Sequence, residues 1–301
     1  MHVTLLHNPR AGGGEPGRDE LVRVLMDAGH AVTYQSTRED GLEHALEAPG
    51  DVVLVAGGDG TVRKAAAQLI GRGVPIALLP LGTANNIFKT LVLSDSLQET
   101  VDALPTAHSM PFDAGTAKGA WGETHFLEGV GLGAFPITMC LAENREDNRE
   151  ARSDHEDLGL TRDLRYLGHV LRTMKPINWQ IEADGEDLSG EYYLCEAMNI
   201  RSVGPNLVLA PGADPADGLL DLVLVSEKER PHLQEYIAGR IAGRDAAIDL
   251  PVRRVRQVTI TAAGAQVHID DRLEHPHEKP SAVGGLVDLT LLPGALLFLC
   301  A

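Results

Sequence analysis

The chain has 301 residues, of which 44% are hydrophobic and 23% are charged, and its formal net charge is −17 at pH 7. This length and composition predict a globular protein with two domains, each large enough to bury a core. The negative charge argues against nucleic acid and against general attraction to anionic lipid, and no apolar run is long enough to cross a bilayer.

Cysteine usage and the N-terminus bear on the compartment. Three widely separated cysteines indicate neither a disulfide framework nor a zinc cluster. Residues 1–6 are typical of a first strand rather than of a signal peptide, so we expect a cytoplasmic protein. The one basic cluster, residues 253–256, is explained more simply by a solvated strand edge than by a lipid-binding patch.

The first predicted strand, residues 3–6, leads into a glycine-rich connection that begins with His7 and Asn8. Such a connection is a common phosphate-side position in α/β units, although a flexible loop needs no ligand. A second strand over residues 31–34 precedes Thr37, whose hydroxyl is followed by acids as at a helix N-cap, and a helix is predicted over residues 41–47. This alternation predicts a parallel sheet with right-handed crossovers.

The most informative stretch is a β-branched apolar run, residues 52–56, that breaks at Gly57, Gly58 and Gly60 around Asp59 and then resumes with helical spacing. A strand, tight turn and helix in this order direct backbone N–H groups and the positive end of a helix dipole at an anion, usually phosphate. Glycines alone could simply turn the chain. The carboxylate of Asp59 favours a nucleotide site that works through Mg²⁺ or a hydroxyl, and we expect Asp59 to be a catalytic residue as well as a nucleotide-binding one.

A second strand of the same kind, residues 74–79, ends in the segment Pro80-Leu81-Gly82-Thr83-Ala84-Asn85-Asn86. Here too a strand leads into a glycine turn and then into a helix. Open α/β sheets bind their ligands at such turns, where neighbouring parallel strands end at their carboxyl ends.

Together the two turns resemble the diacylglycerol kinase catalytic domain, a family that includes bacterial lipid kinases and sphingosine kinases. The first turn, residues 57–61, is similar to the family's nucleotide loop, and the second, residues 80–86, to its Pro-x-Gly-Thr-x-Asn-Asp segment. The resemblance covers nearly the whole chain. It implies a doubly wound α/β nucleotide-binding domain over residues 1–110 and a β-sandwich domain over residues 111–301, whose last strand can return to pack on the first domain. The shorter strands beyond residue 110 agree with a sandwich.

The resemblance further implies ATP and Mg²⁺ as cofactors, a lipid substrate met at a membrane surface, and transient membrane association. It leaves a homodimer open. The residues expected at the nucleotide are Asn8, Thr37, Gly57, Gly58, Asp59, Gly60, Thr61, Gly82, Thr83 and Asn85. Capping of a helix remains the simpler role for Thr37.

Two departures from the family pattern remove negative charge near the triphosphate. Arg63 and Lys64 stand where the family usually has Asn-Glu, and Asn86 stands where it has an acid. Arg63 or Lys64 can contact phosphate directly. Alternatively, this chain has lost a network of charged side chains that the family keeps near the triphosphate.

A loop further along the chain offers oxygen ligands to a hard cation. The carboxylates of Asp214 and Asp217 and the carbonyl of Leu219 have a suitable spacing, although Asp-Gly pairs are also ordinary turn formers. The resemblance favours the cation, because several bacterial lipid kinases hold a structural Mg²⁺ at this place. Ca²⁺ is a second possibility.

The general base is where the chain departs most from the family. An Asp-Gly-Glu turn of the family corresponds to Asp270-Asp271-Arg272, so arginine stands where the glutamate is expected. Because arginine stays protonated in proteins, another carboxylate must accept the proton. The nearby catalytic candidates are Asp271 and Glu274, of which Asp271 is the nearer, although both also fit solvated loop acids.

Three questions therefore remain open at the level of the sequence. The apolar stripe of Leu164, Leu167, Leu171 and Met174 is typical of a core, but it also fits a lipid groove, since the family places acyl chains near an interdomain cleft. A small-molecule kinase of the NAD kinase type would share a related glycine loop. A lipid- or nucleotide-binding protein with impaired catalysis would explain the departures.

Overall fold

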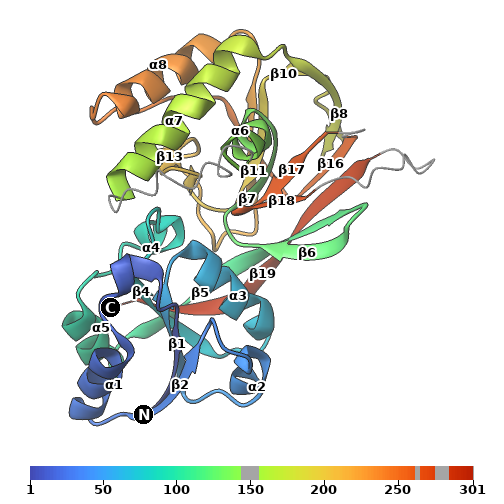
Figure 1. Cartoon of the computed structure of the whole chain (residues 1–301). Helices are drawn as coiled ribbons and strands as arrows, with labels where there is room; N and C mark the ends of the chain where they lie inside the picture. The colour runs from blue at the N-terminus through green and yellow to red at the C-terminus, as the bar shows by residue number, and fades with distance from the viewer. Residues whose placement is uncertain (144–155, 262–264, 275–284, 301) are drawn as a thin grey trace. The chain divides into compact units, whose positions relative to one another are not determined.

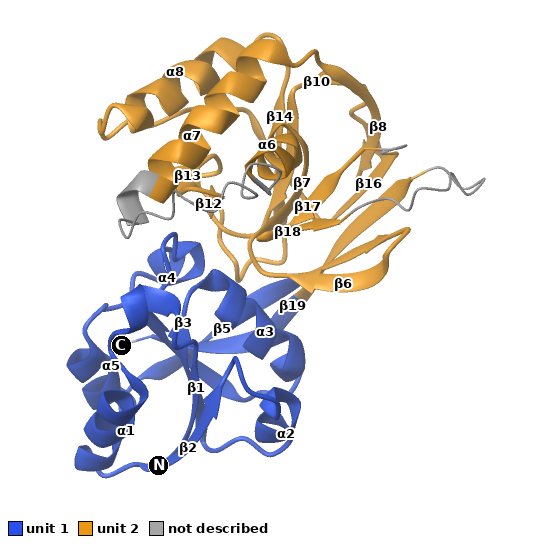
Figure 2. Ribbon diagram, in the orientation of Figure 1, with its two compact units in different colours: residues 1–114, 293–301 blue, residues 115–292 orange. Residues whose placement is uncertain are grey.

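The computed structural model describes the chain in four segments, residues 1–143, 156–261, 265–274 and 285–300. These segments form two units, shown in blue and orange in Figure 2. The first unit comprises residues 1–114 and 293–301, and the second comprises residues 115–292. The C-terminal end of the chain therefore belongs to the same unit as its beginning.

A parallel sheet forms the centre of the first unit. Its strands lie in the order β19-β4-β3-β1-β2, and every neighbouring pair is parallel. The strands are β1 (His2–His7), β2 (Ala31–Ser36), β3 (Val52–Gly57), β4 (Pro75–Pro80) and β19 (Leu286–Cys300). Every residue of β3 is buried, as expected for a central strand that helices cover on both faces.

Helices connect these strands and lie on both sides of the sheet (Figure 1). They are the 3₁₀ turn η1 (Ala11–Gly14) and the helices α1 (Arg18–Asp27), α2 (Leu42–Glu47), α3 (Asp59–Leu69), α4 (Asn86–Leu91) and α5 (Leu97–Ala103). Leu21 and Leu25 of α1 pack with Val101 of α5 against one face of the sheet. Complete burial of one such leucine contributes about 2 kcal/mol relative to leaving it exposed. The predicted doubly wound α/β domain is confirmed.

Two antiparallel sheets pack face to face in the second unit. One has the order β15-β14-β11-β7-β17-β18, and the other contains β10-β8-β16-β19 with β9 and the β5-β6 pair at its margins. Their strands are β5 (His108–Gly119), β6 (Gly122–Phe126), β7 (Gly129–Gly133), β8 (Ile177–Ala183), β9 (Glu186–Asp187), β10 (Gly190–Tyr192), β11 (Leu194–Met198), β14 (Leu220–Val225), β15 (Val252–Val255), β16 (Gln257–Thr261), β17 (Val267–Ile269) and β18 (Arg272–Glu274). Trp179, Phe126 and Ile260 belong to one buried cluster with residues of the six-stranded sheet. The predicted β-sandwich is therefore confirmed.

A helical layer covers the outer face of the six-stranded sheet (Figure 1). It consists of α6 (Ala134–Glu143), α7 (Glu156–Thr173) and α8 (Arg230–Ile241). Side chains along β11 alternate between the two faces: Cys195 and Ala197 belong to the sandwich core, whereas Leu194 and Met198 pack with the helices. A short hairpin of β12 (Ser202–Val203) and β13 (Leu207–Val208) lies beside this layer.

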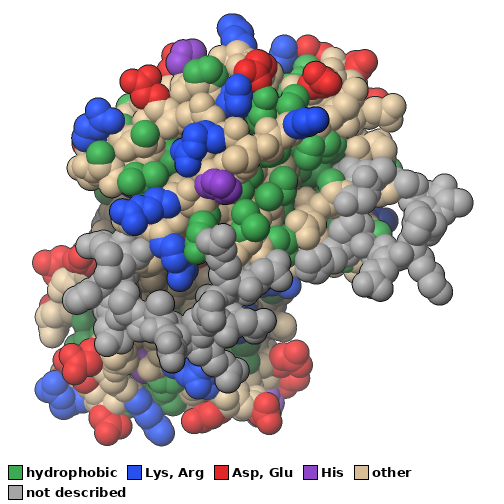
Figure 3. Space-filling model, turned by 45° about the horizontal axis from the view of Figure 1, so that its top comes forward, with side chains coloured by type: hydrophobic (Ala, Val, Ile, Leu, Met, Phe, Trp, Pro, Cys, Tyr) green, Lys and Arg blue, Asp and Glu red, His purple; other side chains and the backbone are tan. Residues whose placement is uncertain are grey.

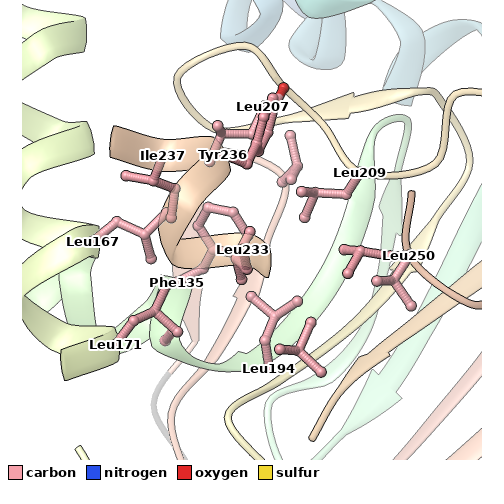
Figure 4. Packing of buried hydrophobic residues seen from close by; sticks show 14 of the residues in the cluster. Phe135, Leu167, Leu171, Leu194, Leu207, Leu209, Leu233, Tyr236, Ile237 and Leu250 are labelled. Atoms are coloured by element: carbon pink, nitrogen blue, oxygen red, sulfur yellow. The ribbon is translucent and has the colours of Figure 1, made fainter. Parts of the chain in front are cut away.

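The apolar stripe of α7 is part of this helical layer. Leu164, Leu167 and Leu171 are buried in one cluster with Leu233 and Ile237 of α8. Figure 4 shows the side chains of Leu167 and Leu171 directed toward those of α8. The stripe therefore packs a core within the second unit rather than lining an open lipid groove.

The surface carries charges of both signs in spite of the negative net charge. On the face drawn in Figure 3, acidic and basic side chains are interspersed with hydrophobic ones. None of the helices in the described segments has both the length and the apolar character that crossing a membrane requires.

Candidate active site

The first glycine turn connects β3 to α3 at the carboxyl edge of the parallel sheet. The N-cap of α3 is Gly58, whose carbonyl accepts hydrogen bonds from the N–H groups of Thr61 at 2.8 Å and Val62 at 3.1 Å. The preceding N–H groups at the start of the helix and the positive end of its dipole are directed out of the turn. This arrangement favours a bound anion.

The second glycine turn lies against the first. The N–H group of Leu81 donates to the carbonyl of Gly57 at 3.0 Å, and β4 is the parallel neighbour of β3. A Cβ atom on Gly82 would lie 2.4 Å from Cα of Gly58, and one on Gly58 would lie 2.9 Å from Cα of Gly82. Because no side chain fits at these distances, the contact requires glycine at both positions.

The carboxylate of Asp59 joins the two turns. Its Oδ2 accepts a hydrogen bond from the N–H group of Asn86 at 3.0 Å, and its Oδ1 accepts one from the N–H group of Ile87 at 3.1 Å. These are N–H groups of the first turn of α4, which lack partners within the helix. Asp59 therefore positions α4 in addition to any role toward a nucleotide.

The polar side chains of the second turn differ in exposure. Asn85 adopts a left-handed conformation with φ of +50°, and its side chain accepts from the N–H group of Gly82 at 3.0 Å and donates to the Gly82 carbonyl at 2.6 Å. Its amide thus holds the turn itself. Asn86 is buried, whereas Thr83 is exposed, so the hydroxyl of Thr83 is accessible to a ligand and the side chain of Asn86 is not.

The connections that follow β1 and β2 reach the same edge of the sheet. The N–H group of Asn8 donates to the carbonyl of Ala56 at 2.9 Å, and the N–H group of Thr37 donates to the carbonyl of His7 at 2.9 Å. Since β2, β1, β3 and β4 are neighbours and parallel, their carboxyl ends bring Asn8 and Thr37 to the edge that carries the glycine turns. Asn8 also accepts a hydrogen bond from the N–H group of Arg10 at 3.3 Å.

The predicted capping role of Thr37 is wrong. The N-cap of α2 is Gly41, which has a φ of +109° and makes no side-chain hydrogen bond to the helix. The hydroxyl of Ser36 instead accepts from the N–H group of Arg38 at 3.2 Å, which stabilises a turn directly after β2. The acids that follow Thr37 lie in the connection before α2, so a hydroxyl followed by acids did not mark the helix start.

Four other predicted residues lie in or beside the first turn. Thr61 is buried with 6% exposure, and a Cβ atom on Gly57 would lie 2.5 Å from its Oγ1, so Thr61 packs beneath the turn. Gly60 and Arg63 are partly exposed on α3, and Lys64 is exposed. Of the two cationic residues that depart from the family pattern, Lys64 is therefore the more accessible.

In the second unit, the hairpin between β17 and β18 carries the expected base. Asp270 is buried with a φ of +51°, and its carboxylate accepts from the N–H groups of Leu127 at 3.1 Å, Glu128 at 2.8 Å and Gly129 at 3.2 Å. Burial raises the pKa of Asp270 to about 6 against the opposing effect of these N–H donors. Asp271, which follows it, is exposed at the tip of the hairpin.

The other two residues of the expected base region lie on β18. Arg272 is partly buried, and its Nη2 donates to the hydroxyl of Thr124 at 3.2 Å. Glu274 pairs with Val267 in the regular antiparallel ladder, so the strand does not bend back to bring Glu274 to the tip. The structure therefore places Asp271 in the turn and Glu274 away from it.

A buried acid and histidine support this hairpin, and the sequence analysis did not identify them. Nε2 of His268 lies 2.7 Å from Oε1 of Glu196, and Nδ1 of His268 lies 3.1 Å from the carbonyl of Asp270. Both side chains are buried, and Oε2 of Glu196 has no hydrogen-bond partner among the described residues. Each of these residues stands inside an otherwise apolar strand, and a titratable residue in such a place is a sequence feature from which the pair could have been predicted.

The side chains of Glu196 and His268 meet above Gly131, which lies on the strand between theirs. Glu196 and His268 stand opposite Gly131 on its two sides, and a Cβ atom on Gly131 would lie 1.6 Å from Oε1 of Glu196. Glycine is therefore required between them. Burial opposes protonation of His268, but the Glu196 carboxylate and the hydrogen bonds of the ring outweigh it and raise the pKa of His268.

The loop that contains the expected metal ligands is held by its own hydrogen bonds and by an arginine. Oδ1 of Asp214 accepts from the N–H group of Ala216 at 3.0 Å, and Oδ1 of Asp217 accepts from that of Leu219 at 2.9 Å. Oδ2 of Asp217 is paired with the guanidinium of Arg254. Within the described segments, no group of three or more His, Cys, Asp or Glu side chains is arranged to hold a metal ion. As arranged, these residues do not fit a divalent cation.

Comparison with known proteins covers both units. The diacylglycerol kinase catalytic domain matches residues 2–117, and the YegS C-terminal NAD kinase beta sandwich-like domain matches residues 150–300. A diacylglycerol kinase of Mycobacterium tuberculosis (strain ATCC 25618 / H37Rv) is 25% identical over 278 residues, which cover 89% of this chain and 87% of that protein.

Two further proteins agree with this match. A Pseudomonas aeruginosa (strain PAO1) protein named "probable lipid kinase YegS-like" is 29% identical over 280 residues, which cover 89% of this chain and 86% of that protein. The crystal structure of a diacylglycerol kinase from Bacillus anthracis str. Sterne has the same fold, with a TM-score of 0.69 and 20% identity over 100% of this chain and 97% of that chain.

Proposed function

We propose that this chain, which belongs to the diacylglycerol kinase catalytic-domain family and is an ATP-dependent lipid kinase, transfers the γ-phosphate of ATP to a hydroxyl of a diacylglycerol-like lipid. The observation that carries the proposal is the contact of the two glycine turns at Gly58 and Gly82. This contact holds two glycine turns side by side at the carboxyl edge of a parallel sheet, which is where open α/β sheets bind nucleotides and which supports phosphate binding here.

The turns would bind the triphosphate mainly through the backbone. The start of α3 offers N–H groups, and the exposed hydroxyl of Thr83 adds a donor from the second turn. ATP would enter as its Mg²⁺ complex, and the ion would supply positive charge that offsets the charge of the phosphates. Asp59 holds α4 through two N–H groups and so fixes the second turn relative to the first. Catalysis would then rest on positioning and charge neutralisation.

Asp271 is the proton acceptor that we propose for the lipid hydroxyl. It lies at the exposed tip of the hairpin, and the buried carboxylate of Asp270 fixes the backbone beside it. Arg272 cannot accept a proton, and Glu274 lies on β18 away from the tip. The geometry therefore ranks Asp271 before Glu274.

One observation favours a second function, a lipid- or nucleotide-binding protein with impaired catalysis. Arg272 stands at the position of the family's glutamate, and its guanidinium contacts the hydroxyl of Thr124. The side chain is therefore engaged within its own unit and supplies no base. Such a protein would bind ATP or lipid without transferring phosphate.

The proposed place of action follows from the two substrates. ATP is available in the cytoplasm, and the lipid acceptor lies in a membrane, so we propose a cytoplasmic protein that meets the membrane transiently. With a net charge of −17, attraction to anionic lipid as a whole would be weak, so contact would be local and largely apolar.

The test is transfer of labelled phosphate from ATP to diacylglycerol, phosphatidylglycerol, ceramide and a sphingoid base in mixed micelles, with NAD as a soluble acceptor. We expect a labelled lipid product and no labelled NAD. ATP binding by calorimetry without any product would support the impaired binding protein. Transfer to NAD alone would contradict the lipid kinase.

A further inference from the structure

The loop of residues 211–219 and the strand after it concentrate negative charge. Asp214 and Asp217 lie on the loop, and Asp221 follows at the start of β14. Asp221 is 3% exposed, and its Oδ2 has no hydrogen-bond partner in the part of the chain that the structure describes. Carboxylates gathered in this way repel one another unless a cation lies among them. The positive charge must come either from a side chain of the fold or from a bound ion.

Arg254 supplies a positive charge at this place. It lies on β15, the edge strand that pairs with β14, and stands directly opposite Asp221 in the ladder. Its guanidinium contacts Oδ2 of Asp217, so one side chain lies beside both the strand acid and the loop acid. Arginine stays charged at every pH of interest, and its planar group suits a carboxylate.

The contact with Arg254 occupies Oδ2 of Asp217, an oxygen atom that a metal ion would need as a ligand. Oδ1 of Asp217 accepts from the N–H group of Leu219 and Oδ2 contacts the guanidinium, so both oxygens have donors. A Mg²⁺ or Ca²⁺ ion binds six or more oxygen atoms, and a guanidinium on the central carboxylate would repel it. Arginine and a divalent ion are therefore alternatives at this position.

We propose that Arg254 is a built-in counter-cation, which holds the loop of residues 211–219 in place of a divalent metal ion. The loop then folds without a bound divalent ion. Removal of the guanidinium leaves Asp214, Asp217 and the Leu219 carbonyl available, so a divalent ion can replace it.

The chain contains a matched control for this proposal. Arg253 is the preceding residue of β15, and its side chain is 53% exposed, against 52% for that of Arg254. Its guanidinium also pairs with one acid, Glu186, at 3.0 Å. Arg253→Ala thus removes the same charge from the same strand without touching the loop. Glu186 is 58% exposed, whereas Asp217 is 19% exposed, so the pair of Arg253 is exposed on both sides and contributes little to stability.

The experiment is thermal melting of the wild type, Arg254→Ala and Arg253→Ala without ATP. Each protein is measured with EDTA, MgCl₂ or CaCl₂, with NaCl added to equalise ionic strength. We expect the wild type and Arg253→Ala to melt at the same temperature under all three conditions. Arg254→Ala should melt lower in EDTA and regain about 2–4 °C with MgCl₂ or CaCl₂, because the ion binds only the folded state.

Two results would overturn the proposal. A wild type that is stabilised by the divalent ions, or destabilised by EDTA, would show that the loop uses a metal despite Arg254. An Arg254→Ala variant that responds to the ions no more than Arg253→Ala would show that Arg254 does not occupy a cation position. If Arg254→Ala does not fold, Arg254→Gln serves in its place, and the wild-type titration alone still decides the first point. None of these readouts depends on phosphoryl transfer.

Discussion

The glycine turns of the first unit are shaped by contact between two glycines, whereas the hairpin of the second unit is shaped by buried charged side chains. Gly58 and Gly82 touch through their backbones, and no side chain could replace either hydrogen. The hairpin instead depends on Asp270 and on the Glu196–His268 pair, which are buried acids and a buried ring. Backbone shape therefore fixes the proposed donor site, and side-chain electrostatics fix the proposed acceptor site.

This difference teaches where the chain can diverge from its family. A turn whose shape requires glycine has few alternatives, and both turns keep the glycines of the family pattern, although Asn86 replaces an acid in the second. A hairpin held by side chains can be held by a different set of side chains, and here Asp271 and Arg272 depart from that pattern. Substitutions in the two regions should accordingly affect different properties.

The largest expected effect concerns the buried pair. Glu196→Ala leaves His268 buried without its carboxylate, which should lower the free energy of unfolding by about 3–5 kcal/mol. Glu191→Ala, an exposed acid on β10, is the control and should change little. Urea denaturation measures both. Equal stability of the two variants would mean that the pair does not stabilise the second unit.

The next largest effect concerns the contact of the turns. Gly82→Ala introduces a Cβ atom 2.4 Å from Cα of Gly58, so the two turns must separate. Since small displacements of positioned groups cost on the order of 100-fold in rate, we expect a loss of about that size in turnover, together with weaker ATP binding. Gly17→Ala, where nothing lies within 4 Å, is the control. Wild-type kinetics in Gly82→Ala would show that the contact between the two turns is not needed for ATP binding or turnover.

The buried Glu196–His268 pair should make the stability of the protein depend on pH. Folding raises the pKa of His268 above its ordinary value of 6.5, so the protonated pair stabilises the protein fully below pH 6.5. This contribution is lost as the pH rises through the pKa of the folded state, with a slope of up to about 1.4 kcal/mol per pH unit. Denaturation of the wild type and Glu196→Gln between pH 6 and 9 checks this, and the slope should be smaller in the variant. Parallel profiles would contradict it.

The smallest effect on stability concerns Asp59, and it separates the two roles of this residue. Asp59→Ala removes the acceptor for two N–H groups of α4, which should cost about 1 kcal/mol of stability. Asp59→Asn keeps an acceptor oxygen and should recover part of that loss, but it lacks the charge, so turnover should remain low in both. Thermal melting and turnover measured side by side test this. Full turnover in Asp59→Asn would leave the residue with a structural role only.

The sequence predicted the parts of the site that are encoded locally. Glycines directly after an apolar run indicate a turn, and the parallel order of β1, β3 and β4 then brings the turns to one edge. The partners of Asp59, Asp270 and Asp217 could not be predicted in this way. They lie 27–28, 141–143 and 37 residues away, so their contacts depend on strand pairing and on helix placement.

The wrong helix cap at Thr37 and the arginine contact that the metal-ligand spacing did not reveal have the same physical origin. Thr37 was expected to cap a helix because acids follow its hydroxyl, but the helix begins later, after Gly41, whose positive φ ends the preceding turn. The expected metal ligands have the right spacing, but an arginine from another strand occupies the central carboxylate. Spacing along the chain describes only the residues of one loop and omits what packs against it.

Turnover of Asp271→Asn at unchanged ATP affinity tests the central claim most directly. If the glycine turns bind ATP and Asp271 accepts the proton of the lipid hydroxyl, calorimetry will give wild-type ATP affinity, and labelled-phosphate transfer to lipid will fall by about 10²- to 10⁴-fold. Glu274→Gln, on the same hairpin but on β18, should transfer phosphate at nearly the wild-type rate. Wild-type transfer by Asp271→Asn would contradict the account, because the proposed acceptor would then take no part in the reaction.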